Sequence, residues 1–106
     1  MKESPVEKRF KQRFEAHGFK VLKLTTPGTA GVMDRMILRP VWSPGAPFFT
    51  EMKRPGKDAE RLQELMRENW LLRGVIVTEV CDSYEKVDEL LAWALGVCNY
   101  DLVKDL

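Results

Sequence analysis

Glu51 and Lys53 lie two residues apart at the end of an apolar run, within the stretch FFTEMKRPG. A carboxylate can hold a divalent cation, and a nearby ammonium can stabilise a phosphate group. The spacing alone carries little information, because 10 Glu and 9 Lys among 106 residues supply roughly one Glu-x-Lys triplet by chance. The elements that position these side chains must therefore decide between a catalytic site and an ordinary charged strand end.

A predicted hairpin brings Asp34 opposite Glu51. Strands are predicted over residues 32–38 and 48–53, and the short connection between them, rich in Pro and Gly, favours antiparallel pairing. If the turn centres midway along this connection, Asp34 faces Glu51 with Cβ atoms roughly 5 Å apart. Lys53 shares that face by the two-residue period of a strand. The three side chains are therefore predicted to converge on one patch.

Two carboxylates this close repel each other unless a cation lies between them. A hard divalent cation that takes oxygen ligands is the natural candidate. The alternative is a pair of solvated strand ends in which Lys53 neutralises Glu51, and the inferred geometry alone favours neither interpretation. A rim of basic residues tilts the balance toward a site for a phosphate backbone: Lys23, Arg35, Arg54 and Lys57.

Helices are predicted on both sides of the hairpin. Ser4 caps the first helix, Pro5 takes its first position, Glu7 completes a capping box and Gly18 ends it. The order α-β-β-β-α-β-α predicts an α/β fold. The other predicted elements are a strand over 19–24, a helix over 58–72, a buried strand over 75–81 and a last helix from Asp82 or Ser83 to about Leu95.

Two further polar residues are candidates for the site. Glu7 lies at the edge of the apolar face of the first helix, formed by Val6, Phe10 and Phe14, from which it could reach the acidic patch. The capping box alone also accounts for Glu7. Gln63 lies on the second helix and, taken by itself, is a surface residue.

Composition predicts one domain over residues 1–106, since 44% of the residues are hydrophobic and 31% are charged. We expect a soluble protein of the cytoplasm, the host's if the source is viral, with no membrane contact and no organic cofactor. Cys81 and Cys98 are expected to be buried, reduced thiols.

Charge is unevenly distributed along the chain. Up to Lys57 there are 12 Lys and Arg against 5 Asp and Glu, a net charge of +7, and the remainder carries −6. Such a chain can present a basic face to a polyanion while staying nearly neutral overall. The alternative is a solvated asymmetry without function.

Assembled, these residues give the chain a resemblance to the VRR-NUC nucleases, the virus-type replication-repair branch of the PD-(D/E)xK superfamily, over nearly its whole length. Met33 stands where the family usually has proline; proline offers no side-chain ligand, so the change removes none, but it leaves the start of the second strand open. The matching motif residues are Glu7, Gly31-Val32-Met33-Asp34 for G-V-P-D, Glu51-Met52-Lys53 for E-x-K, and Gln63.

The resemblance implies an αβββαβ nuclease core, in which helices flank a mixed central sheet and a C-terminal helix follows. Such a core would cleave phosphodiester bonds with Mg²⁺, for which Mn²⁺ substitutes. Asp34, Glu51 and the main-chain carbonyl of Met52 would hold the metal, and Glu7 would serve a second metal site. Lys53 would orient the attacking water, assisted by Gln63.

Family members made of this module alone are expected to be homodimers that cut branched DNA in repair and recombination, Holliday junctions especially, whereas larger members cut flaps as monomers. The length of the chain places it with the first group. Two alternatives remain: a branched-DNA-binding module without catalysis, and a related nuclease acting on flaps or linear duplex. A dimer interface is expected among Trp42, Phe48, Trp93 and residues 95–102.

Overall fold

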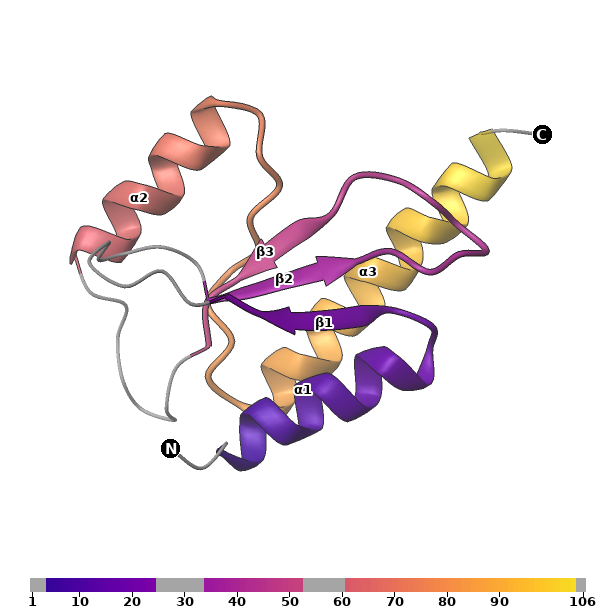
Figure 1. The fold of residues 1–106 in the computed structure, drawn as a ribbon, viewed down its shortest axis with the longest axis horizontal. Helices are drawn as coiled ribbons and strands as arrows, with labels where there is room; N and C mark the ends of the chain where they lie inside the picture. Colours follow the sequence, from indigo (N-terminus) through magenta and orange to yellow (C-terminus); the bar gives the residue numbers. More distant parts are fainter. Residues whose placement is uncertain (1–3, 25–33, 53–60, 105–106) are drawn as a thin grey trace.

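A computed structural model describes residues 4–24, 34–52 and 61–104, without the side chains of 61–63 and 99–104. The helices and strands follow each other in nearly the predicted order (Figure 1). They are α1 (Pro5–Ala16), β1 (Lys20–Lys23), β2 (Arg35–Leu38), β3 (Phe48–Thr50), α2 (Arg61–Leu72) and α3 (Tyr84–Lys104).

The start of α1 has the predicted capping box. The N–H of Glu7 donates to the hydroxyl of Ser4 over 3.2 Å, and the N–H of Ser4 donates to Oε2 of Glu7 over 2.9 Å. These two bonds satisfy main-chain donors that a helix start leaves without partners inside the helix. After the helix, Gly18 adopts φ +93°, a conformation that favours glycine, and so turns the chain toward β1. Both predicted ends of α1 are confirmed.

The three strands form an antiparallel sheet in the order β1-β2-β3. In the hairpin, Arg35 pairs with Thr50 and Met36 pairs with Phe49. This is the register predicted by centring the turn midway between the strands. The main-chain N–H of Leu24 also donates to the carbonyl of Asp34 over 2.8 Å, which extends the β1-β2 pairing by one step.

Residues 75–81 run parallel to β3, but the continuous strand predicted there is wrong. Two isolated bridges join the segments, one between Phe49 and Val77 and one between Met52 and Cys81. The chain advances three residues between the bridges on the first side and four on the second. The extra residue interrupts the hydrogen-bond ladder as a bulge does. The pairing of the described segments is nevertheless mixed, because this segment is parallel and the others are antiparallel.

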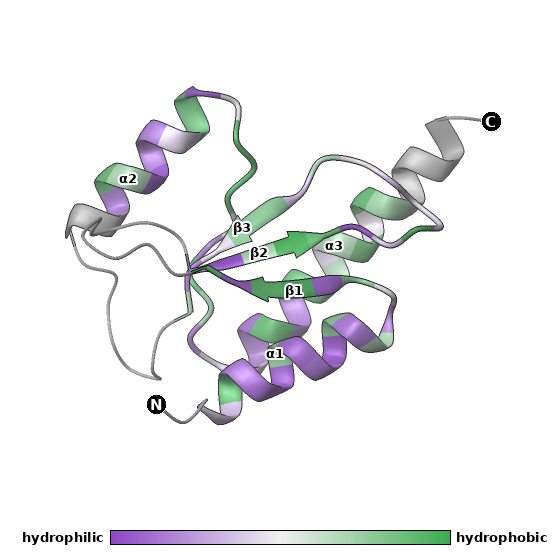
Figure 2. Ribbon diagram, viewed as in Figure 1, coloured by the Kyte–Doolittle hydropathy of each residue, from purple (hydrophilic) through white to green (hydrophobic). Residues whose placement is uncertain are grey.

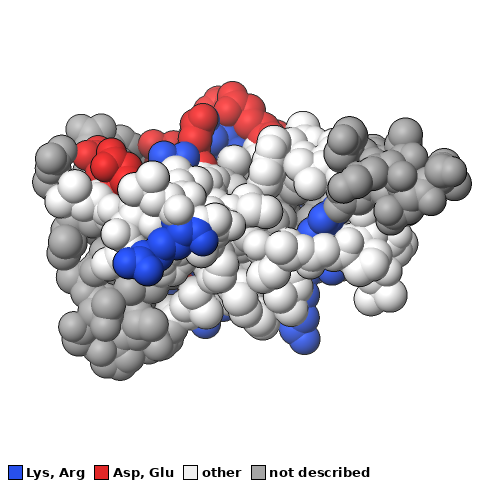
Figure 3. All heavy atoms as spheres, turned by 90° about the horizontal axis from the view of Figure 1, so that it is seen from above, with Lys and Arg blue, Asp and Glu red and all other residues white. Residues whose placement is uncertain are grey.

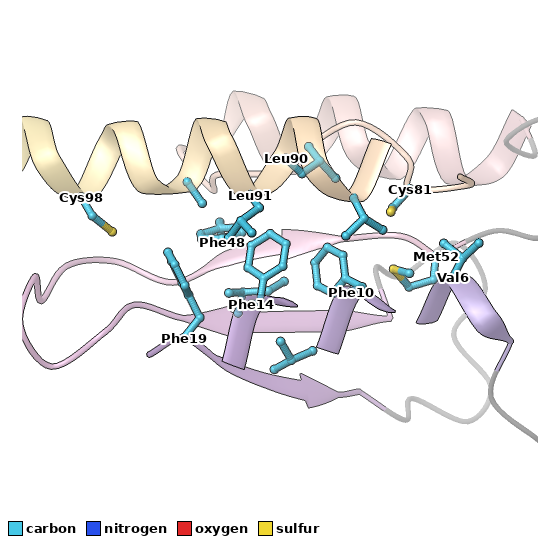
Figure 4. Close-up of a cluster of buried hydrophobic side chains, with 14 residues drawn as sticks. Val6, Phe10, Phe14, Phe19, Phe48, Met52, Cys81, Leu90, Leu91 and Cys98 are labelled. Atoms are coloured by element: carbon cyan, nitrogen blue, oxygen red, sulfur yellow. The ribbon is translucent and has the colours of Figure 1, made fainter. Parts of the chain in front are cut away.

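The core lies between the sheet and the two helices α1 and α3 (Figure 4). Phe14 is its centre: its ring stacks on Phe10 with centroids 4.2 Å apart and meets Phe19 edge-on at 5.4 Å. Cys81 and Cys98 are buried free thiols, as predicted. Apolar residues of α1 face inward while hydrophilic residues cover its outer side (Figure 2).

The last helix is longer than predicted. Ser83 caps it by accepting the N–H of Lys86 over 3.1 Å, and α3 then continues through Gly96 to Lys104. This extension is anchored at Cys98, which is buried and whose carbonyl accepts the hydroxyl of Ser43 over 3.0 Å. Packing thus offsets the cost of a glycine inside a helix, about 1 kcal/mol. None of the described helices is long and apolar enough to cross a membrane.

Helix α2 lies apart from α1 and α3 (Figure 1). Its Trp70 ring packs edge-on against Phe49 with centroids 5.2 Å apart. The side chain of Arg67 donates to the main-chain carbonyl of Thr78 over 3.1 Å, which links α2 to the segment beside β3. The helix ends as predicted, before Gly74 with φ +85°.

Candidate active site

Asp34 and Glu51 both lie where the hairpin opens toward its free ends, directly before β2 and directly after β3. Continuing the Arg35–Thr50 pairing by one residue places Asp34 opposite Glu51. The carboxylate of Asp34 accepts the main-chain N–H of Met52 over 3.0 Å, which fixes it across the hairpin. Glu51 is 5% exposed, and its main-chain carbonyl accepts the N–H of Cys81 over 2.9 Å. The strand register therefore brings the two predicted carboxylates to the same end of the hairpin.

Arg35 lies buried between two of the acidic residues. One guanidinium nitrogen is 3.2 Å from Oε1 of Glu7 on α1, and another is 3.2 Å from Oδ2 of Asp34. The second nitrogen also donates to the main-chain carbonyl of Asp34 over 3.2 Å. Arg35 thereby joins the first helix to the start of β2.

The side chain of Glu7 both completes the capping box and reaches the acidic site. Its Oε2 accepts the N–H of Ser4 in the capping box, whereas its Oε1 faces Arg35. The side chain is about one-fifth exposed, at 22%. One carboxylate thus completes the helix start and also reaches the acidic site.

The electrostatics of the site act most clearly on Asp34. Burial raises the pKa of its carboxyl above the ordinary value of 3.8, and the nearby carboxylate of Glu7 raises it further. The N–H of Met52 and the charges of Arg35 and Lys23 act in the opposite direction and offset only part of this rise. A positive charge added beside Asp34 would favour its ionised form.

The donor chemistry fits a hard divalent cation. The carboxylates of Asp34, Glu51 and Glu7 offer the oxygen ligands that Mg²⁺ and Mn²⁺ prefer, and a carboxylate oxygen that accepts one hydrogen bond keeps further lone pairs. Among the described residues, no three carboxylate, histidine or cysteine side chains are already gathered as a ligand set. The part of Met52 in contact with Asp34 is its N–H.

The basic residues predicted around the site fall into different positions. Lys23 is exposed at the end of β1, opposite Arg35 in the register. Arg35 is only 4% exposed, which differs from the solvent-facing position that a phosphate contact requires. On the face shown in Figure 3, acidic side chains gather along one margin and the described basic side chains are scattered. The remaining candidates lie outside the description: Lys53, Arg54 and Lys57 entirely, and Gln63 in its side chain.

Sequence reasoning assigned Arg35 to the basic rim and missed its place between the carboxylates. The sequence contained a sign of this position, because Arg35 opens the apolar run of β2 and a buried arginine needs an acidic partner. Asp34 precedes it directly in the chain. The second partner, Glu7, comes from a distant helix and required the fold.

Comparison with solved structures finds a likeness in both fold and sequence. A solved structure described as a "VRR_NUC domain" superimposes with a TM-score of 0.70 and is 33% identical in sequence, over 82% of this chain and 90% of that one. No family model matches the chain, and no curated protein matches it. One-third identity over nine-tenths of the other chain goes beyond a likeness of fold alone.

Proposed function

Because the chain belongs to the VRR-NUC domain family, and is by that membership a nuclease of the PD-(D/E)xK type, we propose that it is a metal-dependent endonuclease selective for branched DNA. The observation that supports this most is the Asp34–Glu51 pair at the hairpin end, with Asp34 tied to the N–H of Met52. One or two carboxylates, together with oxygens of the substrate phosphate, are the usual way in which a protein holds Mg²⁺, and this pair at the ends of adjacent strands can supply them.

The proposed metal ligands are Asp34, Glu51 and the main-chain carbonyl of Met52, with Glu7 serving a second metal site. A bound Mg²⁺ or Mn²⁺ would supply Lewis-acid stabilisation of the charge that develops on the phosphate. Strand pairing and the Met52 N–H hold Asp34 in place before any substrate binds, so the position of this ligand is set in advance.

Lys53 follows Glu51 by two residues, so a continued strand would carry both side chains on one face. We assign Lys53 to orienting the attacking water and to offsetting charge on the phosphoryl group. Gln63 is assigned to holding Lys53 or that water in place. Lys23, Arg54 and Lys57 are assigned to phosphate contacts along the DNA backbone, which are independent of base sequence.

Selectivity for branched DNA is proposed from the size of this nuclease domain. Its 106 residues offer little surface for reading base edges beyond the site itself, which favours recognition of DNA shape. Holliday junctions, which arise in recombination and repair, have the twofold symmetry that a homodimer can match with two active sites.

A homodimer interface is proposed on the apolar side of α3. A groove there is lined by Ala46, Ile76, Trp93 and Val97 among others, and Trp93 and Ile76 are 42% and 41% exposed. Trp42, at 45%, is also exposed. Phe48, expected at this interface, is instead buried in the core at 4% exposure, with its ring 5.2 Å from that of Trp93.

The test is a cleavage panel of four-way junction, flap, single-stranded and linear duplex DNA, each with Mg²⁺, Mn²⁺ or a chelator. We expect cleavage of the junction with either metal, none with the chelator and much slower cleavage of linear duplex. Failure to cleave any substrate at saturating Mn²⁺ would overturn the enzymatic proposal, and junction binding without cleavage would favour the binding-module alternative. Sedimentation equilibrium tests the dimer separately.

A further inference from the structure

Arg35 gives the acidic site a positive charge of its own. The guanidinium is 4% exposed and lies 3.2 Å from carboxylate oxygens of both Glu7 and Asp34. Burial strengthens the electrostatic interaction of this charge with its neighbours, because little water screens it. The pairing places one cation between two anions at the point where a divalent cation is proposed to bind.

Neither carboxylate depends on Arg35 for its position. Oδ1 of Asp34 accepts the N–H of Met52 over 3.0 Å, and Oε2 of Glu7 accepts the N–H of Ser4 over 2.9 Å. Each acid is therefore anchored to the main chain through the oxygen that does not face Arg35. What Arg35 adds is mainly charge.

We propose that Arg35 is a built-in counter-ion of the site, which stabilises the metal-free fold and at the same time weakens the binding of divalent cations. Without metal, its charge relieves the repulsion between Glu7 and Asp34. With metal, the same charge opposes a second cation beside Asp34. The inference rests on the proposed function for the identity of the metal site.

The two possible roles of Arg35, as a counter-ion or as a residue that positions the carboxylates, predict opposite changes in metal affinity when it is removed. If Arg35 served only to hold the carboxylates in place, its removal would loosen the ligands and weaken metal binding. If it serves as a counter-ion, its removal leaves two anchored carboxylates with excess negative charge, and metal binding becomes tighter. A poorly screened unit charge within a few ångströms changes the dissociation constant by at least about tenfold.

The experiment compares wild type, Arg35→Met and Arg35→Lys by calorimetric titration with Mn²⁺ in the absence of DNA, and by thermal unfolding with and without Mn²⁺. For Arg35→Met we expect a metal-free midpoint lower by roughly 10 °C and a Kd for Mn²⁺ at least about tenfold lower than wild type. Arg35→Lys keeps the charge and should keep a Kd close to wild type. Arg13→Met is the matched control, because Arg13 pairs with Asp88 on the surface at 3.3 Å. Its loss should change neither the Kd for Mn²⁺ nor the shift in unfolding midpoint that Mn²⁺ causes.

An unchanged or higher Kd for Mn²⁺ in Arg35→Met overturns the proposal. If this variant fails to fold without metal, it is refolded in Mn²⁺: recovery of the fold supports the counter-ion role, and failure to recover overturns it. DNA cleavage by wild type separates the two proposals. Tighter Mn²⁺ binding by the variant, with no cleavage by wild type, upholds the counter-ion and rejects the nuclease assignment of this chain's site.

Discussion

The carboxylate of Asp34 accepts the main-chain N–H of Met52, 3.0 Å away across the hairpin. A side chain at the start of β2 is thus held by the main chain just beyond β3, at the residue after Glu51. An acid fixed in this way keeps its place when its charge is changed conservatively. This allows charge and geometry to be separated by mutation.

Asp34→Asn is expected to reduce metal-dependent cleavage by roughly 10²-fold or more while leaving DNA binding nearly unchanged. The amide oxygen of Asn can still accept the N–H of Met52, so the substitution removes ligand charge and not the anchor. Single-turnover cleavage and a gel-shift assay in a chelator measure the two effects. Asp88→Asn on the surface of α3 is the control, and a loss under tenfold in Asp34→Asn would contradict Asp34 as a ligand.

The same substitution should change how stability depends on pH. Burial raises the pKa of Asp34, so the folded protein favours the protonated carboxyl. The contribution of Asp34 to the free energy of unfolding is therefore fully present below its ordinary pKa of 3.8 and is lost as pH rises through the raised pKa. Metal-free Asp34→Asn lacks this loss, so its free energy of unfolding relative to wild type should increase between pH 3.5 and pH 7. Urea unfolding of chelator-treated protein measures the difference, and a decrease over that interval would show that the pKa is not raised.

Lys53→Ala is expected to slow the chemical step by roughly 10²-fold or more without raising the concentration of Mn²⁺ needed for half-maximal rate. The reason is that Lys53 is assigned to water and phosphoryl charge, whereas the metal ligands are untouched. Lys20→Ala, at an exposed position of β1, removes an equal charge away from the site. Cleavage by Lys53→Ala at the wild-type rate would remove Lys53 from the mechanism.

Phe14→Ala should be among the most damaging core substitutions. Phe14 has no exposed surface, and its ring contacts those of Phe10 and Phe19. Loss of the ring and the resulting cavity are expected to lower the free energy of unfolding by about 3–5 kcal/mol. Denaturant unfolding gives the value, with exposed Val41→Ala as the comparison; a cost below about 1 kcal/mol would contradict the central place of Phe14.

Cys81 should resist thiol reagents in the folded protein. Burial raises the pKa of its thiol to about 12, so almost none of it is the reactive thiolate at pH 8. We expect slow modification of native protein by a disulfide reagent and rapid modification of both cysteines after unfolding. Fast native labelling that mass spectrometry assigns to Cys81 would show that the thiol is accessible.

Local signals in the sequence carry much of this fold. The capping box of Ser4 and Glu7 and the stops at Gly18 and Gly74 depend on neighbours within one helical turn, so they are readable without tertiary information. The hairpin register is also accessible, because a short connection leaves few ways to pair two strands. From this register the meeting of Asp34 with Glu51 follows.

Features that depend on distant contacts were not predictable in the same way. The pairing of residues 75–81 with β3 is interrupted between Val77 and Cys81, because this segment advances four residues where its neighbour advances three. Arg35 is buried against Glu7 from another element, and α3 continues past its predicted end where Cys98 contacts Ser43 from a distant loop. The roles given to Lys53 and Gln63 stay predictions, since those side chains lie outside the described part of the chain.

The attachment of α2 has a consequence for local opening. Two contacts link this helix to the rest of the protein: Trp70 packs against Phe49, and Arg67 donates to the carbonyl of Thr78. None of its described side chains belongs to the hydrophobic core between the sheet, α1 and α3. A helix joined in this way can detach at a free-energy cost below that of global unfolding, leaving the core intact. Amide hydrogens of α2 should then exchange with solvent earlier than those of α1.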